Sequence, residues 1–310
     1  MSPVISASGL TMRFPGCLAL DGVDFQVPAG AVFALLGENG AGKTTLIRIL
    51  TGFLRASGGS CQVLGLDPLR EALAIRRRVG YVSDAPPLYD WMRVGEIGWF
   101  ASAFYPPGFL ERYRDLIRRY EVPEDGKIRR LSKGQYAKVA LALALASDPE
   151  LLILDEPTAG LDPLVRRSFL ESMVDRAAMG KTVLLSSHQI TEVERVADHV
   201  AFLREGRFCL IRPLNELKET VRLVTVSLTD PLTMLPPLDG SAQILSEQTA
   251  GRQRQWVVLG FSPGMQQSLE AHPGVLGVQA RPATLDELFT ACARPRGSAN
   301  ESLSCEVPTA

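Results

Sequence analysis

Residues 37–44 read GENGAGKT, which fits the pattern G-x-x-x-x-G-K-[ST]. This pattern carries chemistry because glycines let backbone N–H groups surround phosphates, the lysine neutralises their charge, and the following hydroxyl can bind Mg²⁺. The apolar run AVFALL ends at the first glycine, and a helical pattern follows the last one, as the motif requires. We therefore predict a phosphate-binding loop formed by Gly37, Glu38, Asn39, Gly40, Ala41, Gly42, Lys43, Thr44 and Thr45.

A second chemical signal is the acidic pair that follows the apolar run LLIL. These four residues bring Asp155 to the carboxyl end of a predicted buried strand, where ligands gather in parallel sheets. Asp155 can bind Mg²⁺, and Glu156, which points elsewhere, can polarise an attacking water. An acidic pair after a strand is also common as a solvated strand end, but its position after a phosphate-binding loop favours the functional interpretation.

The segments around these motifs indicate an α/β fold with a mostly parallel sheet. Apolar runs at 151–155 and 182–187 are typical of buried strands, and the amphipathic stretch 165–179 lies between them. At the start of the chain, strand-like pieces around the turns LDG and PAG predict a small antiparallel sheet. Over about 94–146 the apolar spacing is helical, with breaks at YPPG and VPEDG, which predicts a helical subdomain.

The character of the chain changes near Pro213. Short β-like pieces then alternate with a helix candidate at GMQQSLEAH, which indicates a small α+β appendage. We predict a first domain over 1–214, an accessory domain over 215–293, and a disordered tail over 294–310 that is rich in Ser, Pro and Gly.

Composition narrows the possible partners. The chain has 310 residues, with 33 basic and 34 acidic side chains and a formal net charge of −1, so no global field favours nucleic acid or an anionic membrane. The five cysteines and three histidines have no metal-ligand spacing. No signal peptide and no stretch of about 20 apolar residues occurs. We expect a cytoplasmic protein that reaches a membrane only through a protein partner.

Several motifs occur in one order over about residues 4–210: Phe14, the phosphate-binding loop, LSKGQ at 131–135, LDEP, AGLD at 159–162, and SSH ending at His188. On these motifs the chain resembles the nucleotide-binding subunit of ABC transporters. The resemblance implies a P-loop NTPase core of ABC type and hydrolysis of ATP with Mg²⁺. It also implies that Phe14 stacks on adenine, that Thr44 and Asp155 serve the metal, and that Glu156 and His188 are catalytic, with His188 contacting the γ-phosphate.

In that family the LSKGQ segment, called the signature, covers the ATP bound by a second subunit. The residues that the resemblance places toward that nucleotide are Ser132, Lys133, Gly134, Gln135 and, from AGLD, Asp162. Lys133 replaces a glycine of the usual LSGGQ, and it either adds a cation near the neighbour's phosphates or points into solvent. Without a dimer, Ser132 would be only the N-cap of an ordinary helix.

One departure from the family concerns the segment GYVSDAPPLYDW, which places Asp84 where the family has a glutamine. No glutamine occurs between Gln62 and Gln135, so an error of register does not explain the difference. Asp84 is either a ligand of Mg²⁺, as carboxylate oxygen favours this cation, or a residue that serves the membrane partner.

The favoured hypothesis is an ATPase subunit that dimerises on ATP, with a copy or a paralogue, and drives a separate membrane-spanning permease from the inner face of the cell membrane. The end of the appendage, RPATLDELFTA, resembles the extension of exporter-type subunits. A soluble ABC protein acting on ribosomes or DNA is the alternative, but the chain has neither a second such domain nor a long coiled coil. An importer subunit also stays open.

Overall fold

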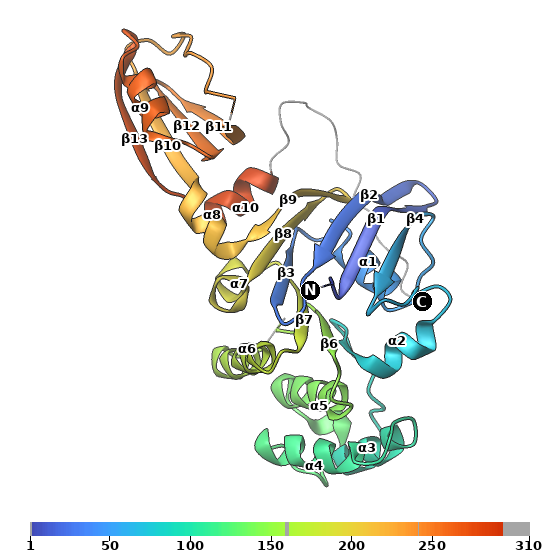
Figure 1. Ribbon diagram of the computed structural model, residues 1–310. Helices are drawn as coiled ribbons and strands as arrows, with labels where there is room; N and C mark the ends of the chain where they lie inside the picture. The colour runs from blue at the N-terminus through green and yellow to red at the C-terminus, as the bar shows by residue number, and fades with distance from the viewer. Residues whose placement is uncertain (1, 159–160, 241, 294–310) are drawn as a thin grey trace. The chain divides into compact units, whose positions relative to one another are not determined.

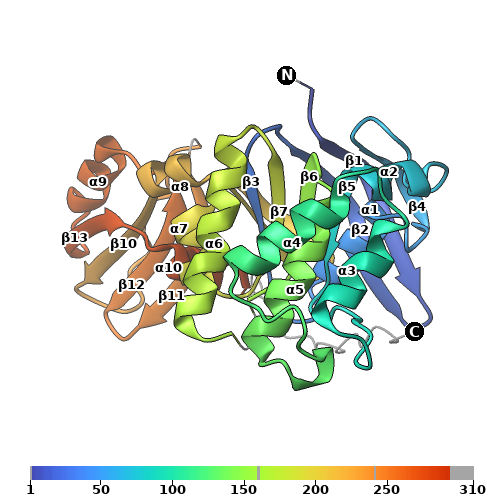
Figure 2. The ribbon, with the colours of Figure 1, turned by 90° about the horizontal axis from the view of Figure 1, so that it is seen from below.

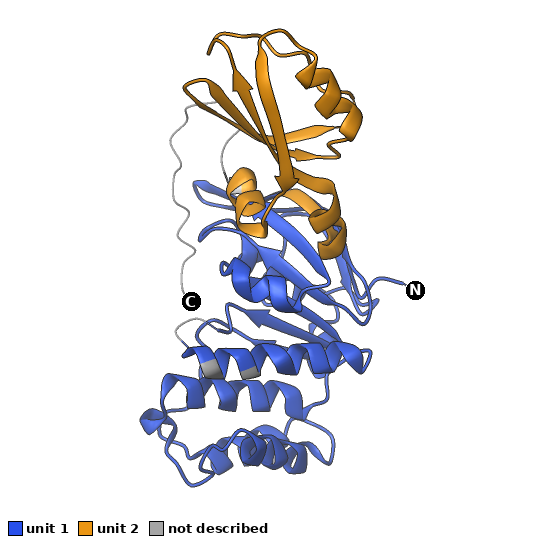
Figure 3. Ribbon diagram, turned by 90° about the vertical axis from the view of Figure 1, so that its left-hand side faces the viewer, with its two compact units in different colours: residues 1–208, 305–310 blue, residues 209–304 orange. Residues whose placement is uncertain are grey.

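The computed structural model describes residues 2–158, 161–240 and 242–293. The described part of the chain divides into two compact units, which are coloured separately in Figure 3: unit 1 over residues 2–208, and unit 2 over residues 209–293. The predicted disordered tail at 294–310, and Ala159 and Gly160 of the AGLD motif, lie outside the described residues.

The main sheet has six strands in the order β5-β6-β7-β3-β8-β9. Four neighbouring pairs, β5 with β6, β6 with β7, β7 with β3, and β3 with β8, run parallel, and every residue of β3, β6 and β7 is buried. This confirms the expected mostly parallel sheet. The strands are β3 (Val32–Leu36), β5 (Val79–Val82), β6 (Leu151–Asp155), β7 (Thr182–Ser187), β8 (His199–Arg204) and β9 (Arg207–Pro213).

Four helices of unit 1 contact strands of this sheet (Figure 1): α1 (Lys43–Leu50), α2 (Ala72–Arg78), α6 (Pro163–Ala178) and α7 (Ile190–Val196). A separate antiparallel sheet has the order β2-β1-β4, formed by β1 (Ile5–Phe14), β2 (Cys17–Val27) and β4 (Gly58–Val63). The prediction of a turn at LDG was wrong. β2 continues through this segment, where its pairing with β1 is irregular. Gly22 adopts a φ of 65° at this irregularity, and its N–H donates to the Thr11 hydroxyl.

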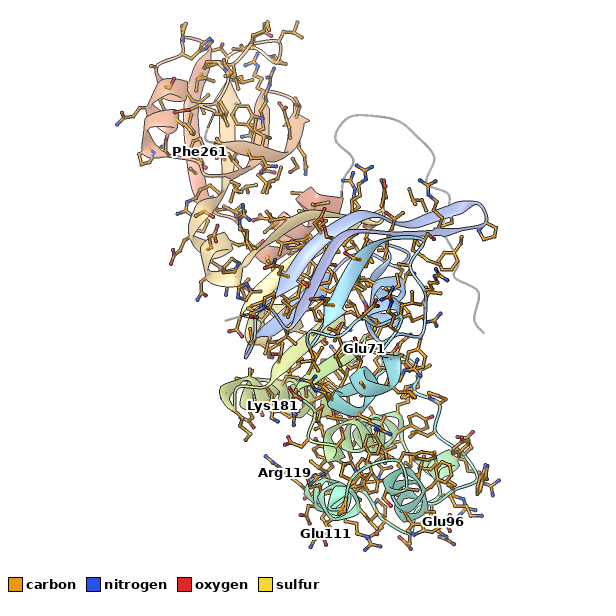
Figure 4. All side chains as sticks on the ribbon, turned by 45° about the vertical axis from the view of Figure 1, so that its right-hand side comes forward. Glu71, Glu96, Glu111, Arg119, Lys181 and Phe261 are labelled. Atoms are coloured by element: carbon orange, nitrogen blue, oxygen red, sulfur yellow. The ribbon has the colours of Figure 1, made fainter. Side chains whose placement is uncertain are left out.

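Three helices form the helical subdomain (Figures 1 and 2): α3 (Val94–Ser102), α4 (Phe109–Arg119) and α5 (Lys133–Ala146), with a short 3₁₀ turn at Ile128–Arg130 before α5. The breaks between them fall at YPPG and VPEDG. The helices enclose a hydrophobic cluster in which Tyr113 is fully buried and donates its hydroxyl to the Val94 carbonyl at 2.8 Å. Exposed charges such as Glu96 and Glu111 lie on the outer side of α3 and α4 (Figure 4).

Unit 2 contains an antiparallel sheet of order β11-β12-β10-β13. Helix α9 packs against β13, and Trp256 is 4% exposed in the hydrophobic cluster that these elements share. The sequence pattern had indicated three of the four strands and α9, but it missed α8, β13 and α10. The elements are α8 (Leu214–Thr220), β10 (Val221–Leu228), β11 (Gln243–Ala250), β12 (Gln253–Leu259), α9 (Pro263–Glu270), β13 (Val275–Pro282) and α10 (Leu285–Ala293).

No helix within the described ranges is both long enough and apolar enough to cross a membrane.

Packing in the helical subdomain depends on Gly98 of α3. A Cβ at this position would lie 2.1 Å from two ring carbons of Tyr113. We expect Gly98→Ala to cost about 2–3 kcal/mol, because a buried ring cannot move aside, and to lower the thermal unfolding midpoint by roughly 4–12 °C. Gly95→Ala is the matched control on the same helix, since its Cβ meets only the flexible Glu124 side chain. Equal midpoints for the two variants would contradict this account.

Candidate nucleotide-binding and catalytic site

The loop between β3 and α1 is shaped by its glycines. Gly40 and Gly42 have φ values of 82° and 107°, which other residues rarely adopt. A Cβ at Gly37 or at Gly42 would also lie 2.5 Å from a backbone oxygen of a neighbouring segment. The loop therefore packs closely and leads directly into α1, whose N-terminal N–H groups favour an anion.

Lys43 is buried at the start of α1. Its Nζ donates to the carbonyls of Gly37 at 2.7 Å and Glu38 at 3.2 Å. The same nitrogen lies 3.2 Å from Oε1 of Glu156, which is also largely shielded from solvent. Lys43 thus joins the glycine-rich loop to Glu156, directly after β6, as the sequence motifs required.

Glu156 is held from several sides. Its φ of 48° is in the left-handed region, which costs a non-glycine residue about 1–2 kcal/mol. Its N–H donates to the Ser186 hydroxyl at 3.0 Å, and its Oε2 lies 2.7 Å from Nδ1 of His188. Strained backbone of this kind concentrates at functional sites. Glu156 therefore has a fixed side-chain position between Lys43 and His188.

Asp155 is 1% exposed and accepts a hydrogen bond from the Ser186 hydroxyl at 2.6 Å. Ser186 is paired with Asp155 in adjacent parallel strands, so one hydroxyl serves both acidic residues. Sequence reasoning quoted Ser186 only as part of SSH. The signal that could have identified it is a polar pair at the end of an otherwise apolar strand.

Asp84 faces the same group of charges. Burial raises the pKa of its carboxyl, the negative charges of Asp155 and Glu156 raise it further, and His188 partly opposes them. Tyr81, at the end of β5, has its pKa raised to about 12 by burial and then by Asp155. The charge of Asp155 therefore acts on both Asp84 and Tyr81.

A network that sequence reasoning missed supports the segment after Glu156. The buried Glu192 of α7 accepts a hydrogen bond from the Thr158 hydroxyl at 2.6 Å and forms an ion pair with Arg166 of α6 at 3.0 Å. Arg166 also donates to Gln189 at 2.8 Å, directly after His188. No sequence pattern distinguishes these residues from ordinary charges on helix surfaces.

The signature residues occupy the start of α5. The Ser132 hydroxyl accepts from the Gln135 N–H at 3.2 Å, and the Gln135 side chain accepts from the Ser132 N–H at 3.0 Å, which forms a capping box. Ser132 and Lys133 are exposed, and a Cβ at Gly134 would lie 3.7 Å from the Asp162 carboxylate. The described contacts within one chain do not join these residues to Lys43 or Glu156.

Phe14 is the remaining predicted site residue. It ends β1, pairs with Cys17 across the hairpin, and is half-buried. Contacts therefore join Lys43, Glu156 and His188, the Ser186 hydroxyl links Asp155 to Glu156, and Asp84 lies within reach of their charges.

Comparison with known proteins gives a consistent result. The family model described as ABC transporter matches residues 20–159. An uncharacterized ABC transporter ATP-binding protein of Nostoc is 40% identical over 207 residues, which cover 64% of this chain and 61% of that protein. The Nod factor export ATP-binding protein I of Ralstonia nicotianae is 32% identical over 299 residues, which cover 93% of both chains.

Solved structures agree with the sequence relatives. The structure described as the ATP binding subunit of an ABC transporter has a TM-score of 0.65 and 29% identity, and the match covers 70% of this chain and 92% of that one. The resemblance carried by the ordered motifs is thus confirmed, and the chain belongs to the ABC transporter family, among its ATP-binding subunits.

Proposed function

We propose that this chain hydrolyses ATP as one of two ATP-binding subunits that drive export through a separate membrane-spanning partner. The observation that carries the proposal is the position of Glu156, whose carboxylate lies 3.2 Å from Lys43 and 2.7 Å from His188. The resemblance to the Ralstonia protein includes the region of unit 2, and that protein is named for export. The chain would work in the cytoplasm, at the inner face of the cell membrane.

The residues around Glu156 fit distinct parts of the reaction. The loop N–H groups and Lys43 bind the phosphates of ATP, and Phe14 provides a ring for the adenine. Glu156 polarises the attacking water, because its fixed carboxylate can accept a proton. His188 orients that carboxylate through Nδ1 and leaves its other ring nitrogen for the γ-phosphate.

Oxygen donors suit Mg²⁺ at this site. Thr44, Asp155 and Asp84 would hold it, since hydroxyl and carboxylate oxygens are the ligands that this cation prefers. Burial first, and then the negative charges of Asp155 and Glu156, raise the pKa of the Asp84 carboxyl, and a cation would offset those charges. Within the described residues, no group of three or more His, Cys, Asp or Glu side chains could hold a metal by itself, so phosphate oxygens would complete the shell. Bound there, Mg²⁺ would neutralise charge on the phosphates.

The signature would act across a dimer. Ser132 and Lys133 are exposed at a helix N-terminus whose first turn has no acidic residue, so an anion is favoured there. With Gly134, Gln135 and Asp162, they would face the nucleotide held by the Lys43 loop of a second subunit. That subunit is either another copy or a paralogue. The capping box fixes the direction of the Ser132 side chain within its own chain.

An exposed aromatic cluster supports the proposal that the chain docks to a membrane-spanning partner. Tyr89 lies 6.0 Å from Trp91 and 5.8 Å from Phe100, and Phe100 lies 5.6 Å from Phe104, measured between ring centroids. All four residues are classed as exposed, and Trp91 is 69% exposed. Contiguous exposed apolar surface marks protein interaction sites, and aromatic residues anchor them. This cluster follows the Asp84 loop, which would link docking to the nucleotide.

Replacing Glu156 tests the catalytic assignment. Glu156→Gln should retain MgATP binding while hydrolysis falls on the order of 10²-fold or more, since the amide cannot act as a base. The protein should accumulate as an ATP-bound dimer, measurable by light scattering. Glu150→Gln is the control at the other end of β6, because Glu150 pairs only with the surface residue Arg78 in the described part. Unchanged turnover in Glu156→Gln would assign the base elsewhere, with His188 the next candidate.

Mixing two defective subunits tests the shared site. Lys43→Ala damages one half-site and Ser132→Arg the other, so a mixed dimer restores one intact composite site. We expect ATPase activity above that of either variant alone, if copies of this chain pair and one site can turn over by itself. Mixed dimers that form, as shown by two affinity tags, but recover no activity would count against a composite site.

The aromatic cluster can be tested with two equally exposed indoles. Trp91→Ala should weaken co-purification with the membrane partner by about tenfold or more, as expected for an interface anchor. Trp99→Ala is the matched control, because Trp99 is 67% exposed on α3 but has no ring contact with the cluster among the described residues. Equal loss of the partner in both variants would remove the special role of the cluster. The thermal midpoint of each variant serves to check its folding.

A further inference from the structure

The segment after Asp84 is fastened to α5 by a single phenol. The Leu88 N–H donates to Oη of Tyr136 at 3.0 Å, and that hydroxyl donates to the Pro86 carbonyl at 2.6 Å. Tyr136 directly follows Gln135, the last residue of the signature. One oxygen atom therefore bonds the Asp84 loop at two points from the first turn of the signature helix.

The loop is suited to transmit a displacement. Pro86 and Pro87 have fixed φ angles and no N–H group, so Leu88 carries the first backbone donor after the pair. Its N–H also donates to the Pro86 carbonyl at 3.0 Å, which closes a tight turn. The Leu88 side chain packs against both the cluster beneath the parallel sheet and the cluster of the helical subdomain. The segment is therefore stiff and anchored, with Asp84 two residues before its first bonded carbonyl.

The two ends of this connection belong to different parts of the proposed reaction. Asp84 interacts with the charges of Asp155, Glu156 and His188 in its own chain. Ser132 and Gln135, one turn from Tyr136, form the capping box at the exposed start of α5. The start of α5 is therefore connected to Asp84 by the two hydrogen bonds of Tyr136 and by the short segment that contains Pro86 and Pro87. A displacement of α5 would move Asp84 along this connection.

We propose that Tyr136 is a positioning residue that fixes Asp84 relative to the signature helix, so that engagement of the signature by a second subunit sets the position of Asp84 at the nucleotide. The inference rests on the proposed function for its consequence in catalysis. The phenol is required because a phenylalanine ring could fill the same space but could neither accept from Leu88 nor donate to Pro86.

The direct test is hydrogen exchange in the absence of nucleotide and Mg²⁺. In Tyr136→Phe, the amide of Leu88 should exchange about fivefold faster or more, since it loses one of its two acceptors. Tyr113→Phe is the matched control, because it also removes one phenolic hydrogen bond in the helical subdomain but does not touch the Asp84 loop. Unchanged exchange at residues 84–91 in Tyr136→Phe would overturn the proposal.

A double-variant cycle with Asp84→Asn then separates positioning from a merely structural bond. Tyr136→Phe and Asp84→Asn should each raise the Mg²⁺ concentration for half-maximal ATPase by about two- to tenfold, and the double variant should be no worse than Asp84→Asn alone. Where Asp84→Asn does shift the Mg²⁺ dependence, additive effects, or faster exchange in Tyr136→Phe without such a shift, would reduce Tyr136 to a structural role and overturn the proposal. If Asp84→Asn itself leaves Mg²⁺ dependence unchanged, the proposed metal role of Asp84 fails. The hydrogen-exchange experiment then decides by itself whether Tyr136 holds the Asp84 loop in place.

Discussion

The parallel register of β3, β6 and β7 is the constraint on which the site depends. Leu36 pairs with Ser187, and Asp155 pairs with Ser186, so three strands end at the same edge of the sheet. The glycine-rich loop begins directly after β3, Glu156 directly follows β6, and His188 directly follows β7. Because side chains alternate along a strand, a slip of one residue would turn Asp155 to the opposite face of the sheet. The buried apolar strands therefore determine which polar residues meet at the site, because the strands impose the register.

Several buried polar groups at and beyond the end of this sheet share partners. The Ser186 hydroxyl accepts from Glu156 and donates to Asp155, and the carboxylate of Glu192 is shared between Thr158 and Arg166. Leaving such a group without its partner lowers the free energy of unfolding by about 1–3 kcal/mol, and by more when the group is charged. The network of Glu192 holds the segment beyond Glu156 against the helix that follows His188, so backbone strain at Glu156 is supported from both sides.

The sequence predicted the parts of the fold that repeat a simple pattern. Continuous apolar runs identified β3, β6 and β7, and GENGAGKT identified the loop, because both signals are local. The LDG turn was a wrong prediction because Gly22 fits a β-bulge as well as a turn. Tyr136 and Glu192 could not have been found, since a hydrogen bond to Pro86 or an ion pair with Arg166 joins residues far apart in the chain. Among the described contacts, none joins the signature to Lys43 within one chain, which a dimer would explain.

The placement of the tryptophans makes the two units optically distinct. Trp91 and Trp99 are mostly exposed in unit 1, whereas Trp256 is 4% exposed within the core of unit 2. Indole emission shifts to longer wavelength as water surrounds the ring, so emission from unit 1 should be red-shifted and readily quenched by solutes, while Trp256 emits at shorter wavelength from a shielded environment. Loss of the short-wavelength component thus reports the unfolding of unit 2, and quenching of the long-wavelength component reports on the surface of the helical subdomain.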